Sequence, residues 1–192
     1  MKLERKRFEK WRQRLVCAGQ RSRLVFIDEL SVSNALVRQY GWGPQGERIK
    51  DYEPLSSWKT YSLIAAIRST GWCGSLLVPG AVNGDIFITY LEQCLIPTLR
   101  RGDIVVLDNV RFHHNASVAD VLSEAGIGLH YLPPYSPDFN PIENAFSALK
   151  AHLRRLAKRT FYSLATAIGD LQEATTRQTC YNYLAACRYL NV

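Results

Sequence analysis

Three acidic residues stand at positions where a folded chain can bring carboxylates together. Asp28 ends the apolar run 24–28 (LVFID), and Asp108 ends a second one, 104–108 (IVVLD). Glu143 follows the proline-rich segment 132–141 (LPPYSPDFNP), where a helix is expected to open. Carboxylate oxygens are the ligands that hard divalent cations prefer, and two such cations can support phosphodiester chemistry. The three residues therefore predict a metal-dependent site for phosphoryl transfer.

Each of these acids also has a purely structural interpretation. An acid at a strand end commonly serves in a cap or turn, and an acid in the first turn of a helix is favoured by the helix dipole. Glu29, the neighbour of Asp28, is the alternative candidate for the first position. Taken together, the three acids favour a catalytic site over separate structural roles, because two strand ends and one helix start can converge at one edge of a sheet.

The elements that would position these residues are apolar strands and amphipathic helices. Strands are expected at 24–28, 60–67, 74–78, 104–107 and 127–132, with a hairpin turn at 69–71. Helices are expected at 3–15, 84–99, 116–125 and 141–158, then from a cap at Ser163 to 176, and at 179–189. This order predicts an α/β fold, a ribonuclease H-like mixed five-stranded sheet with three antiparallel strands and then two parallel ones, flanked by helices.

Composition restricts the protein class. A chain of 192 residues with 47% hydrophobic and 21% charged residues suits one well-buried domain. No apolar run approaches the roughly 18 residues of a membrane helix, so a soluble cytoplasmic protein is expected. The five cysteines form an odd set without a Cys-x-x-Cys pair, which favours free thiols over a disulfide framework or a zinc site.

Positive charge is concentrated at the start of the chain. Residues 1–23 hold nine Lys and Arg against two Glu, a surplus equal to the formal charge of +7 of the whole chain. Residues 1–22 are therefore predicted to be a basic helical arm or linker, and residues 23–192 the catalytic domain. Such an arm suits a polyanionic partner, and a solvated linker is the equally weighted alternative.

Three motifs together resemble a known family. They are 26–29 (FIDE), 107–109 (LDN) followed by His113 and His114, and 132–144 (LPPYSPDFNPIEN). They closely resemble the catalytic domain of IS630-type transposases, members of the Tc1/mariner superfamily with its Asp-Asp-Glu (DDE) triad. The 34 residues between Asp108 and Glu143 match the spacing of that family. The resemblance covers about residues 22–160.

The resemblance implies a DNA transposase activity. The chain would cleave transposon ends and transfer strands into target DNA at TA sites, with two Mg²⁺ (or Mn²⁺) ions held by Asp28, Asp108 and Glu143. Its partners would be double-stranded DNA, both transposon ends and target, without a membrane. It would act in the bacterial cytoplasm, associated with the nucleoid when bound to DNA.

The resemblance also implies that the chain acts with a partner protein. Full-length members carry helix-turn-helix modules for which this chain has no room, so a homodimer or pairing with a protein that carries the DNA-recognition domain is expected. Two other functions stay open. One is another ribonuclease H-like DNA nuclease, and the other is a non-autonomous DNA-binding remnant that modulates a full-length transposase.

Residues around the triad are further candidates for DNA binding. Lys150 and Arg154 share a helix face with Glu143 and are predicted to contact phosphates, with a solvated basic face as the alternative. Asn109 is a candidate to orient Asp108 or a water molecule. The remaining candidates are His113 and His114, for orienting DNA or the attacking water or capping a helix. Trp42 and Tyr135 are candidates for base stacking, with core or loop packing as the favoured alternative.

Overall fold

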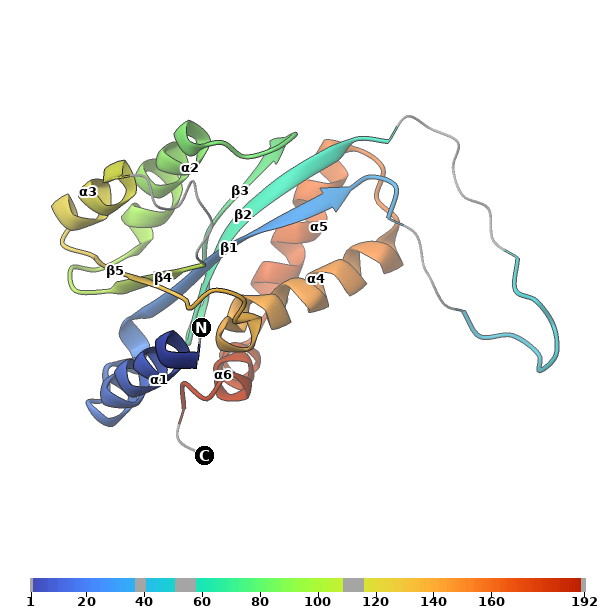
Figure 1. The fold of residues 1–192 in the computed structure, drawn as a ribbon. Helices are drawn as coiled ribbons and strands as arrows, with labels where there is room; N and C mark the ends of the chain where they lie inside the picture. Colours follow the sequence, from blue (N-terminus) through green and yellow to red (C-terminus); the bar gives the residue numbers. More distant parts are fainter. Residues whose placement is uncertain (1, 37–40, 51–57, 109–115, 191–192) are drawn as a thin grey trace.

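The computed structural model describes residues 2–36, 41–50, 58–108 and 116–190. At its centre lies a five-stranded sheet in the order β3-β2-β1-β4-β5 (Figure 1). β1, β2 and β3 pair antiparallel, whereas β4 pairs parallel with both β1 and β5. The strands are β1 (Leu24–Ser33), β2 (Thr60–Arg68), β3 (Gly71–Pro79), β4 (Ile104–Leu107) and β5 (Gly128–Tyr131). The predicted ribonuclease H-like mixed sheet is confirmed.

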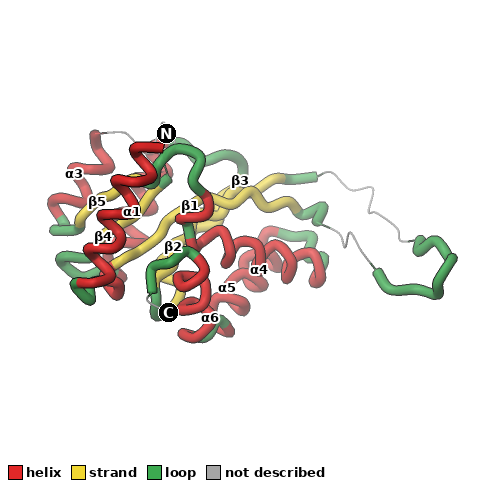
Figure 2. The backbone as a smooth tube through the Cα atoms, turned by 60° about the horizontal axis from the view of Figure 1, so that its bottom comes forward, coloured by secondary structure: helices red, strands yellow, loops and turns green. Residues whose placement is uncertain are grey.

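Helices cover both faces of this sheet (Figures 1 and 2). One core lies between the sheet and α4, α5 and α6, and a second lies between the sheet and α2 and α3. The helices are α1 (Lys2–Cys17), α2 (Gly84–Tyr90), α3 (Ala116–Glu124), α4 (Pro141–Leu156), α5 (Phe161–Ala174) and α6 (Arg177–Ala186). None of the helices in the described part of the chain has the length and apolarity that crossing a bilayer would require.

Several element boundaries differ from the sequence prediction. β1 runs to Ser33 and not to residue 28, because Leu30 and Val32 continue its buried alternation. After Tyr90, α2 gives way to a π-helical turn (Leu91–Leu95) and a 3-10 turn (Ile96–Thr98), where Pro97 lacks the N–H that an α-helix needs. Ser163 is not the N-cap of α5. Thr160 is the cap, and the two side chains form a reciprocal capping box.

The basic first helix packs onto the body of the protein. Phe8, Arg12, Leu15 and Val16 of α1 are buried, and Phe8 and Leu15 belong to the same core as α4. The exposed side of the helix carries a row of cations at four-residue spacing, namely Lys2, Lys6, Lys10 and Arg14. The segment predicted as an arm is thus a docked helix with one apolar and one basic side. The boundary between residues 22 and 23 stays a prediction.

Candidate active site

Asp28 of β1 and Asp108, the residue that follows β4, lie at equivalent levels of two neighbouring parallel strands. Phe26 of β1 pairs with Val106 of β4, and each aspartate follows two residues later. Neighbouring strands are about 4.8 Å apart. Phe26 and Val106 both point into the core beneath α4, so the alternation of side chains brings both aspartates to that face of the sheet. The sequence placed Asp28 at the end of a strand, but it lies inside β1, which continues to Ser33. β4 does end directly before Asp108.

Glu143 reaches the same region from the first turn of α4. Pro141 opens this helix, a position where its missing N–H costs no hydrogen bond. A buried stripe of apolar residues sets the rotation of the helix against the sheet: Ile142, Ala145, Phe146, Leu149 and Leu153. Glu143 lies outside that stripe and is exposed.

The three carboxylates line one cavity of about 420 Å³. The proline-rich segment forms most of the remaining wall, through Leu132, Pro133, Pro134, Tyr135, Ser136, Pro137 and Asn140. Within the described residues, no group of three or more His, Cys, Asp or Glu side chains is close enough together to hold a metal ion. The three acids therefore share an open space without forming a closed ligand cluster, and their catalytic role stays a prediction.

Two neutral donors fix the orientation of the Asp28 carboxylate. The backbone N–H of Glu29 donates to Oδ1 at 2.7 Å, and the side-chain amide of Asn140 donates to Oδ2 at 2.8 Å. Glu29 belongs to the opposite side of β1 and is not among the residues that line the cavity. Of the two neighbouring acids, Asp28 is therefore the one placed at the candidate site.

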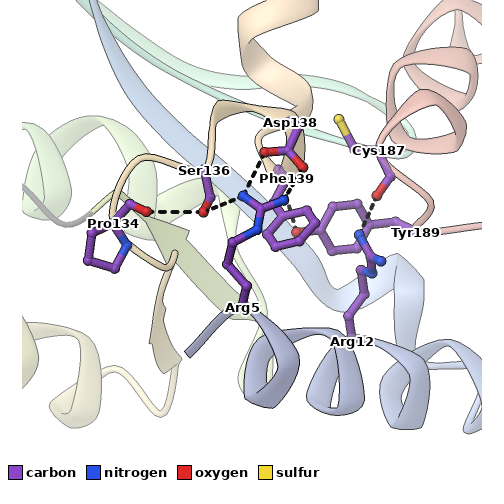
Figure 3. A network of polar contacts seen from close by, with 8 residues as sticks. All are labelled: Arg5, Arg12, Pro134, Ser136, Asp138, Phe139, Cys187 and Tyr189. Atoms are coloured by element: carbon purple, nitrogen blue, oxygen red, sulfur yellow. Dashed lines mark hydrogen bonds and ion pairs between the residues drawn. The ribbon is translucent and has the colours of Figure 1, made fainter. Parts of the chain in front are cut away.

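The wall of the cavity is tied to α1 (Figure 3). Arg5 donates to both carboxylate oxygens of Asp138, at 2.9 and 2.6 Å, and to the hydroxyl of Ser136 at 2.8 Å. The hydrogen bond from Arg5 holds the pKa of the Asp138 carboxyl below its ordinary value. Ser136 in turn donates to the carbonyl of Pro134 at 3.2 Å. This network orders the segment that leads into α4.

The C-terminal part of the chain holds the same segment from the other side. The hydroxyl of Tyr189 donates to the carbonyl of Phe139 at 2.8 Å, and Arg12 donates to the carbonyl of Cys187 at 2.7 Å. The ring of Phe139 stacks on Phe8, with centroids 5.2 Å apart. Sequence analysis did not single out Arg5, Arg12 or Tyr189, because no motif marks them and their partners lie far along the chain.

The other candidates differ in where they lie. Lys150 is exposed and Arg154 half-buried on α4, and their contact with DNA stays a prediction. Tyr135 and Trp42 are exposed, at 91% and 104%, so the packing alternative is wrong for both. Tyr135 also has a φ of 53°, a left-handed backbone conformation that is uncommon outside glycine. Asn109, His113 and His114 lie outside the described residues.

Comparison with known proteins gives a family and a set of structural neighbours. The family model described as DDE superfamily endonuclease matches residues 23–166. A pre-cleavage Mos1 transpososome matches with a TM-score of 0.79 and 18% identity, over 93% of this chain and 56% of that chain. The Mos1 strand transfer complex matches with a TM-score of 0.76 and 19% identity, over 98% and 60%.

An isolated domain gives a similar result. The Mos1 transposase catalytic domain with Raltegravir and Mg matches with a TM-score of 0.71 and 18% identity, over 96% of this chain and 88% of that chain. The chain thus spans a little over half the length of the transposase in the Mos1 transpososome and most of its catalytic domain. No curated protein matches the chain. At these identities the neighbours establish the fold alone.

Proposed function

The chain belongs to the DDE superfamily of endonucleases, and on that basis we propose that it is the catalytic domain of a DNA transposase. It cleaves transposon ends and joins them to target DNA, with TA as the target site. The observation that carries this proposal is the placement of Asp28, Asp108 and Glu143 around one cavity of a ribonuclease H-like fold. Structures of the same fold include the Mos1 paired-end complex with the left transposon end and the Mos1 strand transfer complex.

The donor set of the cavity fits a divalent hard cation. All three charged groups are carboxylates, and the cavity is wide enough to retain water, as Mg²⁺ requires. Mos1 paired-end complexes with Mn and with Mg support this assignment. We propose two ions, Mg²⁺ or Mn²⁺. When bound, they would activate an attacking oxygen and neutralise charge on the transferring phosphoryl group.

Residues of the chain orient the carboxylates and leave a path for the phosphodiester. Asp28 accepts one hydrogen bond from the backbone N–H of Glu29 and one from the side-chain amide of Asn140, and these two bonds fix its orientation. Glu143 extends from the first turn of α4 and lines the same cavity. The phosphodiester is proposed to enter past Tyr135, an exposed side chain on the wall of the cavity.

The DNA surface extends outward from this cavity. Lys150 and Arg154 follow Glu143 along α4 and are proposed to hold phosphates, which positions DNA without reading its sequence. The exposed row of cations on α1 (Lys2, Lys6, Lys10 and Arg14) is proposed as a second phosphate surface. The active assembly is proposed to be a homodimer or a pair with a protein that carries a DNA-recognition domain.

One assay tests the activity. The protein is incubated with Mg²⁺ or Mn²⁺, a pre-cleaved transposon end bearing a 3′-OH, and supercoiled plasmid. Joined products that disappear in the Asp108→Asn variant support the transposase. Cleavage without joining would instead indicate another ribonuclease H-like nuclease. DNA binding that Asp108→Asn leaves unchanged, with no product formed, would indicate a remnant that modulates a full-length transposase.

A further inference from the structure

Asn140 occupies the N-cap position of α4 but does not cap the helix. An asparagine at this position ordinarily accepts a hydrogen bond from a backbone N–H in the first turn, which stabilises the helix. The Asn140 side chain makes no such bond. Its amide turns toward β1 instead and donates to Oδ2 of Asp28 at 2.8 Å. The helix therefore gives up a stabilising contact in favour of the carboxylate at the cavity.

The second polar atom of Asn140 supports the same interpretation. The residue is 2% exposed, and its Oδ1 is buried without a hydrogen-bond partner among the described residues. A reversed amide would place Oδ1 against Oδ2 of Asp28, two acceptors that repel each other, so the observed orientation is the favourable one. A buried acceptor without a partner is unfavourable for folding. Departures from local stability rules of this kind are typical of functional sites.

The backbone that carries Asn140 is held in place from two directions. The preceding residue, Phe139, receives the Tyr189 hydroxyl on its carbonyl. Its ring lies beneath the guanidinium groups of Arg5 and Arg12, at 4.3 and 4.9 Å from the ring centroid. These contacts fix the position from which the amide reaches Asp28. The hydrogen bond from Asn140 to Asp28 therefore has a fixed geometry.

We propose that Asn140 is a positioning residue for Asp28, a role that rests on the proposed function of the site. Its amide donates to Oδ2 while the Glu29 N–H donates to Oδ1, so the two bonds together fix the rotation of the carboxylate. Both of these donors are neutral. Asn140 lines the cavity but acts through Asp28 and not on the substrate.

The test uses a serine at position 140 in the full chain. Serine caps helices about as well as asparagine, but its hydroxyl is too short to replace the amide at Asp28. We expect the thermal midpoint of Asn140→Ser to equal or exceed that of the wild type. Mn²⁺ affinity, measured by titration calorimetry or electron paramagnetic resonance, should fall about 10- to 100-fold, as when other groups that orient metal ligands are removed.

The chain offers a matched control in Asn83. It is the N-cap of α2 and does cap its helix, accepting from the backbone N–H of Ile86 at 2.9 Å. Asn83→Ser should leave Mn²⁺ affinity and strand transfer at wild-type values. Asn140→Thr, a second cap-forming variant, should reproduce the loss seen with Asn140→Ser. In an Asp28→Asn background, Asn140→Ser should cause no further loss of Mn²⁺ affinity.

The outcomes separate this proposal from the function on which it rests. Wild-type Mn²⁺ affinity in both Asn140 variants overturns the positioning role, as does an equal loss in the Asp28→Asn background. A wild-type chain that binds no Mn²⁺ overturns it as well. If the wild type binds Mn²⁺ but yields no cleaved or joined DNA, the proposed transposase fails, while the Mn²⁺ titrations still decide the role of Asn140.

Discussion

Arg5 and Asp138 form a two-bond ion pair across 133 positions of sequence, with nitrogen–oxygen distances of 2.9 and 2.6 Å (Figure 3). Asp138 lies two residues before Asn140 and five before Glu143. The first helix of the chain is therefore part of the structure that shapes the candidate active site. This contact connects a basic segment, which in sequence resembles a detached arm, to the wall of the cavity.

The first prediction concerns this ion pair. Arg5→Ala should lower the rate of strand transfer several-fold and increase amide hydrogen exchange in residues 134–139. Its effect on the free energy of unfolding should stay below about 1 kcal/mol, because both side chains are partly exposed. Arg5→Lys should be intermediate, since lysine keeps the charge but not the two-bond geometry. Arg177→Ala, which removes an exposed cation from α6, is the control, and unchanged exchange in Arg5→Ala would contradict the prediction.

The second prediction is a pH dependence at the contact between α1 and β5. His130 stacks on Trp11 with ring centroids 3.7 Å apart, and burial lowers the pKa of His130 below its ordinary 6.5. The unfolded chain takes up this proton near pH 6.5, but the folded chain does so only at lower pH. The stabilisation that neutral His130 contributes is therefore complete above about pH 6.5. It is lost as pH falls from there through the lowered pKa of His130 in the folded chain.

A series of thermal midpoints checks this sign. Between pH 7.5 and pH 5.5 the midpoint of the wild type should fall more than that of His130→Phe, which keeps an aromatic ring against Trp11 but cannot titrate. The Arg5–Asp138 ion pair does not interfere with this measurement. Because the pKa of Asp138 is lowered from 3.8 in the folded chain, the stability that the ion pair contributes is lost only below that pH. Parallel curves for the two proteins would show that His130 titrates alike in the folded and unfolded chains.

Much of the sheet could be predicted from the sequence, because its strands carry a strong signal. The runs before Asp28 and Asp108 are short, apolar and bounded by polar residues, and the turn at 69–71 joins β2 to β3 as expected. The order of these elements leaves few topologies. The starts of α2 and α4 were also predictable, since Asn83 and Pro141 have well-defined roles at helix N-termini.

The interior of the site could not be predicted in the same way. Asn140 has the sequence context of a helix cap, and only the fold reveals that its amide serves Asp28, 112 positions away. Arg5 likewise belongs to a run of similar cations, and nothing in that run distinguishes it from Lys6 or Arg7. Long-range pairing depends on how α1 and α4 pack on the sheet, which local periodicity does not encode.

The third prediction tests the three carboxylates one at a time. Asp28→Asn, Asp108→Asn and Glu143→Gln should each reduce strand transfer at least about a hundredfold, because metal-assisted charge stabilisation is worth several kcal/mol. Thermal midpoints should remain near the wild-type value, since each substitution keeps the shape of the side chain. Glu29→Gln discriminates between neighbours, and it should retain most of the activity because this side chain does not line the cavity. If Glu29→Gln strongly reduced strand transfer and Asp28→Asn did not, Glu29 and not Asp28 would be the first carboxylate of the site.

The fourth prediction concerns the basic residues that follow Glu143 on α4. Each phosphate contact contributes about 0.9 to the slope of log binding constant against log salt concentration for double-stranded DNA. Lys150→Ala should therefore reduce the slope by about 0.9, and the double variant with Arg154→Ala by up to about 1.8. The loss should be the same for unrelated DNA sequences, because phosphate contacts do not read bases. Arg177→Ala on α6, also exposed, controls for the removal of a surface charge. A slope unchanged in the double variant would place the DNA elsewhere and leave the basic side of α1 as the remaining phosphate surface.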